Sequence, residues 1–280
     1  MDDLTVASIG ELTAKLGGEI PTPFRLLLKF GSLRIDLESN SLKVVNELSD
    51  YFGAFVLKPT EPQTTAEIVV RAIEHPPISL PFSFTVKQPD PGKSKIKEEY
   101  LDLDNGRIVR KRLTGMLFLF SHGEHLAIGP CEGNPNQVVN FVNNRCIQYF
   151  LDAGWLLAHA AAVSLPFGND LRGLAIAGFS GRGKSTLSLQ LLEDGANFHS
   201  NDRLMVRHAA QGLEMVGVAK LPRINPGTIM NSNALRPMLS PESIARYQAL
   251  SPAELWELEE KYDGRIDKIY GTERFRLDGP

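Results

Sequence analysis

The stretch GFSGRGKS, residues 178–185, decides the fold class of this chain. It fits G-x-x-x-x-G-K-[ST] at every required position, with Gly178, Gly183, Lys184 and Ser185 at the fixed places. Glycines permit backbone torsions closed to other residues, so successive amide N–H groups can converge on phosphate oxygens. A helix that begins directly after them points its positive end at the same anion. The pattern therefore predicts a P-loop.

The residues around this loop supply the context that the motif requires. Apolar strands, a long helix and an amphipathic helix are predicted on either side of it, over 136–158 (helix), 160–165 (strand), 174–179 (strand), 184–195 (helix) and 197–208 (strand). Strand, glycine-rich loop, helix and strand is the order of a nucleotide-binding α/β unit. The segment 166–173 is interpreted as a turn-rich connection, and the strand over 160–165 is expected to run parallel to the P-loop strand.

The first half of the chain has a different character. It predicts strands over 24–31, 33–37, 66–74, 82–87, 107–120 and 125–130, and one helix over 41–53 that Gly53 ends. The change of pattern lies near Pro130–Pro135. We therefore expect two domains, an α+β N-terminal module over 1–132, regulatory or substrate-recognising, and a kinase-like α/β domain over 133–280 with C-terminal helices.

Each predicted nucleotide-binding residue has a physical task. Lys184 supplies a full charge to the β- and γ-phosphates, and the Ser185 hydroxyl ligates Mg²⁺. The loop and the first helical turn complete the predicted ATP site with Gly178, Ser180, Gly181, Arg182, Gly183 and Thr186. No LSGGQ-like or N/T-K-x-D sequence follows, which excludes a transporter ATPase and a GTPase. The remaining chain is too short for a helicase or an AAA-type motor.

A carboxylate near the γ-phosphate is the second requirement of phosphoryl transfer, either to position Mg²⁺ or to accept a proton. Asp202 is the only acidic residue between Gly195 and Glu214, so it is the candidate. His159 precedes the strand over 160–165, and an adjacent strand would bring it beside the phosphates. The alternatives are a solvated turn aspartate and a histidine satisfied within the core.

Bulk composition describes an ordinary globular chain of 280 residues, with 42% hydrophobic residues and a formal charge of −3. This charge argues against a broad nucleic-acid-binding surface. Cys131 and Cys146 form neither a disulfide framework nor a metal cluster, and we expect two reduced, buried thiols. The N-terminal residues lack the layout of a signal peptide, and no apolar stretch is long enough to cross a bilayer. A cytoplasmic protein is expected.

The stretch from His159 to Leu204, with HAAAV, GLAIAGFSGRGKSTLSLQLLEDGA and NDRL, resembles the catalytic core of bacterial HPr kinase/phosphorylase. The resemblance is closest to the related group called the B type, and the family resembles phosphoenolpyruvate carboxykinase in its P-loop sheet. It implies that His159 is the active-site histidine and Lys184 the P-loop lysine. It also implies that Asp202 is the proton acceptor and Ser185 a magnesium ligand.

The sequence departs from that family at three places. The segment between His159 and the glycine-rich loop is several residues longer than in the family. Asn201 stands where the family has the first aspartate of a pair, which leaves Asn201 and Asp202 with Ser185 as the predicted metal ligands. The segment KLPRINPGT (220–228) stands where the family has a further glutamate. Within that segment, Arg223 is a candidate for a phosphate or an acidic substrate, and Asn225 and Thr228 are candidates for metal or nucleotide; the alternative is a linking loop.

These observations predict an ATP-dependent phosphotransferase, a serine/threonine kinase that acts on a small protein partner. A small-molecule kinase is the rival within this class. An ATP-binding regulatory protein with little or no transfer is the alternative from another class. A homo-oligomer is expected from the resemblance, whereas nucleic-acid and membrane partners are not.

Overall fold

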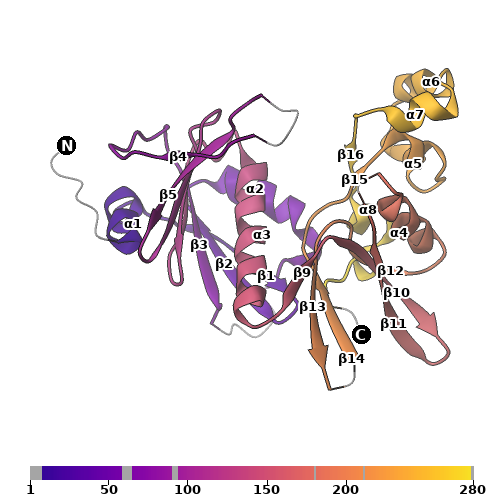
Figure 1. Cartoon of the computed structure of the whole chain (residues 1–280), viewed down its shortest axis with the longest axis horizontal. Helices are drawn as coiled ribbons and strands as arrows, with labels where there is room; N and C mark the ends of the chain where they lie inside the picture. Colours follow the sequence, from indigo (N-terminus) through magenta and orange to yellow (C-terminus); the bar gives the residue numbers. More distant parts are fainter. Residues whose placement is uncertain (1–7, 59–64, 90–93, 180, 211, 279–280) are drawn as a thin grey trace. The chain divides into compact units, whose positions relative to one another are not determined.

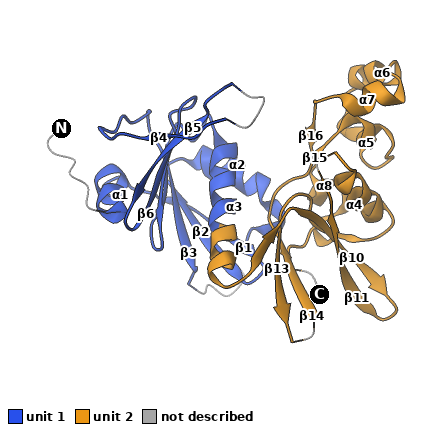
Figure 2. Ribbon diagram, in the orientation of Figure 1, with its two compact units in different colours: residues 1–145 blue, residues 146–280 orange. Residues whose placement is uncertain are grey.

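The computed structural model describes residues 8–58, 65–89, 94–179, 181–210 and 212–278. Within it the chain forms two compact units, residues 1–145 and 146–280 (Figure 2). The division falls inside a long helix, α3 (Pro135–Asp152), rather than at residues 132 and 133 where the sequence pattern changes. Residues 153–158, which were predicted to extend this helix, form instead a turn and a short strand.

Unit 1 is built on one eight-stranded sheet with the order β1-β2-β3-β8-β7-β6-β5-β4 (Figure 1). Its strands are β1 (Phe24–Phe30), β2 (Leu33–Ser39), β3 (Ile68–Glu74), β4 (Thr85–Val86), β5 (Glu98–Leu103), β6 (Gly106–Lys111), β7 (Leu117–Ser121) and β8 (His125–Gly129). Neighbouring strands are antiparallel except for the pairs β2–β3 and β3–β8, which are parallel. The predicted strand over 107–120 is thus two strands joined by a turn, and the second of them, β7, pairs antiparallel with β8, which lies within the strand predicted over 125–130.

Two helices of unit 1 begin at serine caps. In α1 (Ile9–Gly17) the Ser8 side chain accepts a hydrogen bond from the Glu11 amide, and in α2 (Leu42–Tyr51) Ser41 accepts one from the Val44 amide. The helix α2 was predicted from its apolar spacing, whereas α1 was not. A core cluster joins α1 to the sheet and contains Ile9, Leu12, Ile73, Ile108, Leu117, Leu119 and Leu126, among others.

Unit 2 contains three small sheets, with the orders β11-β10-β12, β14-β13-β9 and β15-β16. The strands are β9 (Leu156–Ala158), β10 (Ala160–Phe167), β11 (Asp170–Ala177), β12 (Asn197–Ser200), β13 (Leu204–Ala209), β14 (Gly212–Gly217), β15 (Arg223–Ile224) and β16 (Tyr262–Asp263). The helices are α4 (Lys184–Glu193), α5 (Pro226–Met230), α6 (Pro241–Gln248), α7 (Pro252–Glu257) and α8 (Ile266–Tyr270). The chain is therefore a mixed α/β protein.

One topological prediction for unit 2 is wrong. The strands β10 and β11 pair antiparallel along their whole length, from Ala160 opposite Ala177 to Phe167 opposite Asp170. They form a hairpin whose two-residue turn begins at Gly168, with φ of 63°. Parallel neighbours need a crossover of a dozen or more residues, and this connection is too short for one. The strand predicted over 197–208 is likewise two strands, β12 and β13.

Both cysteines are free thiols and buried, as predicted. Burial raises the pKa of each thiol, Cys131 and Cys146, to about 12, so neither forms a reactive thiolate near neutral pH. In the part of the chain that the structure describes, no helix is both long and apolar enough to cross a membrane.

Candidate functional site

The glycine-rich segment lies where β11 ends and α4 begins. Gly181 and Gly183 have φ of 76° and 82°, the left-handed conformation that side chains other than glycine rarely adopt. The Arg182 amide donates to the Phe179 carbonyl at 3.3 Å, which closes a tight turn between them. A Cβ atom placed on either glycine would meet no described protein atom within 4 Å, so the backbone surface is open to a ligand. Ser180, a predicted contact, lies outside the described residues.

The first turn of α4 offers an anion the positive end of a helix. Its N-cap is Gly183, which makes no side-chain capping hydrogen bond. The first amide N–H groups of any helix lack partners within the helix, and here no capping side chain competes for them. Lys184, Ser185 and Thr186 follow in that turn, as the sequence predicted. The arrangement suits a phosphate group on geometric and electrostatic grounds.

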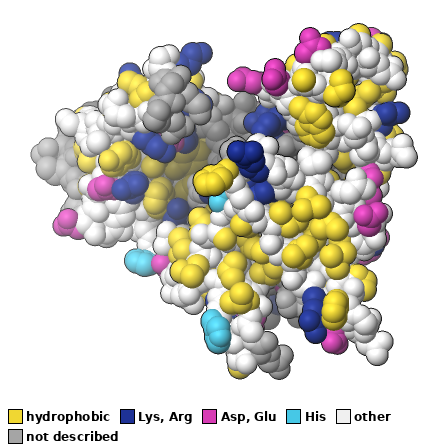
Figure 3. Space-filling model, turned by 45° about the vertical axis from the view of Figure 1, so that its right-hand side comes forward, with side chains coloured by type: hydrophobic (Ala, Val, Ile, Leu, Met, Phe, Trp, Pro, Cys, Tyr) yellow, Lys and Arg dark blue, Asp and Glu magenta, His cyan; other side chains and the backbone are white. Residues whose placement is uncertain are grey.

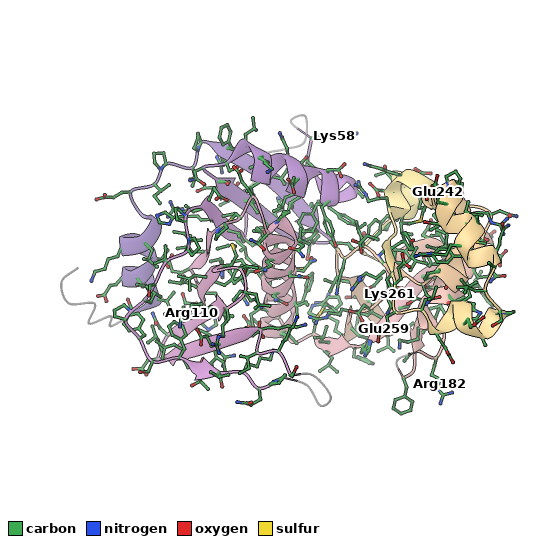
Figure 4. All side chains as sticks on the ribbon, turned by 90° about the horizontal axis from the view of Figure 1, so that it is seen from above. Lys58, Arg110, Arg182, Glu242, Glu259 and Lys261 are labelled. Atoms are coloured by element: carbon green, nitrogen blue, oxygen red, sulfur yellow. The ribbon has the colours of Figure 1, made fainter. Side chains whose placement is uncertain are left out.

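Lys184 lies folded across the segment that precedes it. Its Nζ donates hydrogen bonds to the carbonyl oxygens of Gly178 at 2.7 Å and Phe179 at 3.1 Å. The ammonium group therefore holds the two ends of the turn together. Arg182, by contrast, is exposed and extends away from the body of its unit (Figure 4). Arg182 and Lys184 directly flank Gly183 in the chain, so both cations lie next to the open glycine backbone.

His159 and Asp202 lie next to each other. The strands that position them pair antiparallel, whereas a parallel strand was expected. The Nε2 atom of His159 and the Oδ1 atom of Asp202 are 3.1 Å apart. His159 is the single residue between β9 and β10, whereas Asp202 lies between β12 and β13. Because β9 pairs with β13 and β10 pairs with β12, the two connections face each other.

Asp202 has two further cationic neighbours. Its Oδ2 atom is 3.5 Å from Nζ of Lys220 and 3.9 Å from Nε of Arg203. The side chains of His159 and Asp202 are 64% and 39% exposed, so water screens these contacts and each contributes little to stability. These contacts orient the Asp202 carboxylate, because each of its two oxygens has a neighbouring nitrogen. Asp202 in turn lines a cavity.

That cavity has a volume of about 490 Å³ and gathers the predicted residues of the loop, of α4 and of the two facing connections. Five cationic side chains line it: Arg182, Lys184, Lys220, Arg223 and Lys261. Among its described lining residues, Asp202 is the one carboxylate. A cavity with this balance of charge attracts a multiply charged anion. Lys220 begins the segment 220–228 and Lys261 belongs to no motif; neither lysine was predicted as a site residue.

The segment 220–228 forms the opposite wall. Asn225 caps α5 by accepting a hydrogen bond from the Gly227 amide at 2.7 Å, and it donates to the Leu258 carbonyl at 3.0 Å. Its amide group thus makes hydrogen bonds within the fold, and Asn225 also lines the cavity. Thr228 lines the cavity, and its hydroxyl lies 2.9 Å from that of Thr186. This contact joins α5 to the first turn of α4.

Trp256 of α7 lines the same cavity and is 46% exposed. Its indole ring lies against the backbone of Gly227, where an added Cβ would approach indole Cδ2 to 2.7 Å. Leu255 is buried, but the indole presents a large aromatic surface to the cavity. The spacing of apolar residues in the sequence does not distinguish a side chain that packs in the core from one that lines a cavity.

Several side-chain oxygens of the cavity are of the type that binds metal ions. No cluster of three or more His, Cys, Asp and Glu side chains that could hold a metal ion occurs among the described residues. The Oδ1 atom of Asn201 is buried and has no hydrogen-bond partner in the described part of the chain. Ser185, Asn201 and Asp202 all line the cavity. They are hard oxygen donors of the kind Mg²⁺ takes when phosphates supply its other ligands.

The predicted residues that the structure describes therefore share one cavity, apart from Gly178, which contacts it through Lys184. A scan against protein-family models finds no match, and a search of curated proteins finds none either.

Proposed function

We propose that unit 2 binds ATP at residues 178–186 and transfers its γ-phosphoryl group to a hydroxyl group, as a phosphotransferase of the HPr kinase type. One observation carries the proposal: an open glycine backbone and an uncapped helix start share a cation-lined cavity with a single described carboxylate, Asp202. Recognition of a polyphosphate needs the glycine backbone, the helix start and the cations. Transfer to a hydroxyl group needs the carboxylate. In fold terms we propose the P-loop core that HPr kinase and phosphoenolpyruvate carboxykinase share.

On this proposal, the phosphate tail of ATP occupies the cavity above Gly181 and Gly183. Lys184 exchanges its two carbonyl partners for phosphate oxygens, which its flexible stem permits. The amides of the first α4 turn donate to the same oxygens. Arg182 and Lys220 contribute further positive charge. This charge stabilises the negative charge of the transferring phosphoryl group.

The residues present fit a magnesium ion. Ser185 and Asp202 would hold it through oxygen, with Asn201 Oδ1 next to them, and phosphate oxygens would complete the shell. Magnesium would neutralise charge on the β- and γ-phosphates. Asn201 is a weaker ligand than an aspartate because it is uncharged, so we expect metal affinity in the absence of nucleotide to be low.

The transfer step follows from Asp202. The acceptor hydroxyl oxygen forms a bond to the γ-phosphorus while the bond from that phosphorus to the bridging oxygen of ADP breaks. The bonding electron pair leaves with ADP, and the Asp202 carboxylate takes the hydroxyl proton. His159 and Lys220 hold the two oxygens of that carboxylate in place, at 3.1 and 3.5 Å. Both are positioning residues on this account.

The proposed acceptor is a serine or threonine of a small partner protein, which unit 1 would recognise or regulate. The proposal rests here on the sequence resemblance alone. A small hydroxylated molecule is the rival acceptor, and an ATP-binding regulator without transfer is the rival function. The replacement of a carboxylate by Asn201 favours that regulator.

A second copy of the chain is the further partner that we propose. Unit 2 exposes Phe167, Leu171 and Leu174 on and beside β11, and Figure 3 shows hydrophobic side chains gathered over its strands. The strand β11 lies at the end of its sheet, and no strand of the described residues pairs with its outer edge. Light scattering should give a dimer or larger assembly, which Leu171→Glu with Leu174→Glu dissociates. A monomeric wild-type chain would contradict this.

Transfer itself is tested with γ-labelled ATP and Mg²⁺. The chain is incubated with lysate of its source organism or with a panel of small hydroxylated molecules. We expect label on one protein band or one compound, lost in Lys184→Ala and in Asp202→Asn. Asp170→Asn, an exposed aspartate at the β10–β11 turn, is the matched control and should retain transfer. ATP binding with no transfer in either arm would establish the regulator instead.

A further inference from the structure

Unit 1 contains a larger cavity of its own, of about 620 Å³. It lies between α3 and residues of the strands β5, β6 and β7, together with the segment that follows β4. None of its described lining residues belongs to the cavity of unit 2. Its volume falls in the range of about 300–1,000 Å³ that is typical of small-molecule sites.

The lining of this cavity is strongly cationic. It includes Lys87, Lys95, Lys97, Lys111 and Arg145, against Glu98 as the one carboxylate among the described lining residues. Glu98 already bonds to Lys87 at 2.5 Å and to Lys111. The charges of Lys95 and Lys97 have their natural complement in an anion inside the cavity.

One of these cations is built into an aromatic wall. Arg145 is 7% exposed, and its guanidinium carbon lies 4.0 Å from the ring centroid of Phe120 and 5.4 Å from that of Phe141. Phe141 in turn packs on Phe118, with ring centroids 5.0 Å apart. Stacking on rings fixes the plane of a guanidinium, which prepares it to bind a planar or tetrahedral anion. The same rings offer an apolar body a flat surface.

The helix α3 contributes neutral polar groups. Asn136, Asn140 and Asn144 follow each other at four-residue spacing, so they share one face of the helix, and all three are exposed and line the cavity. A fourth amide, Gln137, contacts the Thr114 hydroxyl at 3.2 Å and thereby ties α3 to the turn between β6 and β7. Amides both donate and accept, so they suit hydroxyl or ester oxygens next to an anionic group.

We propose that unit 1 carries a separate binding site for a small ligand that joins an anionic group, phosphate or carboxylate, to an aromatic or apolar body. Lys95, Lys97 and Arg145 bind the anion, the α3 asparagines bind neutral polar atoms, and Phe118, Phe120 and Phe141 contact the body. This site is independent of nucleotide binding in unit 2. It gives the N-terminal unit a ligand-sensing capacity that does not depend on the proposed phosphotransferase.

The test uses ligand-observed NMR on the full chain with three matched probes: phenyl phosphate, phenylacetate and neutral benzyl alcohol. We expect at least one anionic probe to bind about tenfold more tightly than benzyl alcohol, and added salt to weaken that binding. The better anion identifies the ligand class. Equal binding of all three probes, or no binding of either anion at millimolar concentration, would overturn the proposal.

Two sets of variants locate the binding. Lys95→Gln with Lys97→Gln removes two exposed charges of the cavity, and the affinity for the anion should fall about tenfold. Lys15→Gln with Lys29→Gln removes two exposed charges elsewhere in unit 1 and should change nothing. Because phenyl phosphate could also bind in unit 2, the titrations of both lysine pairs are made in the Lys184→Ala background, so that binding in unit 1 is compared by itself. Equal losses in both lysine pairs in that background would refute a site in unit 1.

Discussion

His159 and Asp202 lie at two facing chain connections, with His159 Nε2 3.1 Å from Asp202 Oδ1. The first connection joins β9 to β10, and the second joins β12 to β13. Each connection runs between the same two sheets, because β9 pairs with β13 in one sheet and β10 pairs with β12 in the other. Ala158 is paired with Leu204, and Ala162 with Ser200, so backbone hydrogen bonds bracket the contact on both sides. The carboxylate is thus oriented by the sheets, and the histidine keeps it there.

This relationship predicts the behaviour of His159→Gln. The variant should fold normally, with a free energy of unfolding within about 1 kcal/mol of wild type, because the contact between the two side chains is exposed. Phosphoryl transfer should fall by roughly tenfold or more, since the carboxylate loses its support. Combining the change with Asp202→Asn should add little further loss. His208→Gln, an exposed histidine on β13, is the control, and an equal fall in that variant would contradict the assignment.

A second prediction concerns the backbone of the glycine-rich segment. Gly183 has φ of 82°, where an alanine costs about 1–2 kcal/mol. Gly183→Ala should therefore lower the unfolding free energy by about that amount and weaken ATP binding. Gly123→Ala is the control, because Gly123 meets no atom that a Cβ would approach within 4 Å. Thermal unfolding and a nucleotide titration would measure both effects; unchanged ATP affinity in Gly183→Ala would mean that the loop backbone does not form the phosphate site.

A third prediction assigns Trp256 to the nucleobase. Its exposed indole borders the phosphate cavity, and stacking of a base on an aromatic ring contributes about 1–3 kcal/mol. Trp256→Ala should weaken ATP binding by about tenfold and leave inorganic tripolyphosphate unaffected, whereas Trp256→Phe should restore most of the affinity. Calorimetric titration with ATP and with tripolyphosphate separates the contribution of the nucleobase from that of the phosphates. Equal losses for ATP and tripolyphosphate would argue for a structural role.

The fourth prediction concerns pH and unit 1. Burial, with a contribution from Arg145, lowers the pKa of His125 from 6.5 to about 4. The unfolded chain therefore binds this proton more readily, and His125 opposes folding as the pH falls from 6.5 towards 4. The loss of unfolding free energy across that window should reach about 3 kcal/mol at most. Denaturant unfolding at pH 7 and pH 5 should show a shallower fall in His125→Gln than in wild type; parallel curves would contradict it.

The sequence determined the local structure around the loop and left the pairing of strands undetermined. The helix at Lys184 and the cap at Ser41 follow from residue types within a few positions, so they could be predicted. The direction of β10 relative to β11 depends on the connection at Gly168, which is too short for a parallel crossover. The length of this connection is the signal in the sequence that indicates an antiparallel pair.

The composition of the candidate site shows the same limit. His159, Lys184 and Asp202 stand out by type and position, and the structure gathers them at one cavity. Lys261 and Trp256 reach that cavity from the C-terminal segment, through a packing arrangement that no spacing pattern encodes. The amide role of Asn225 could have been recognised, because Asn before Pro226 is a common helix N-cap.

The central claim is that residues 178–186 bind the polyphosphate of ATP, and calorimetric titration with magnesium ATP tests it most directly. We expect saturable binding to the wild-type chain, weakened about tenfold to a hundredfold in Lys184→Ala because a charge-assisted hydrogen bond is worth about 1.5–3 kcal/mol. Arg172→Ala, an exposed cation on β11, should bind like wild type. Binding that is absent from the wild-type chain at millimolar ATP, or equal in wild type and Lys184→Ala, would contradict the claim.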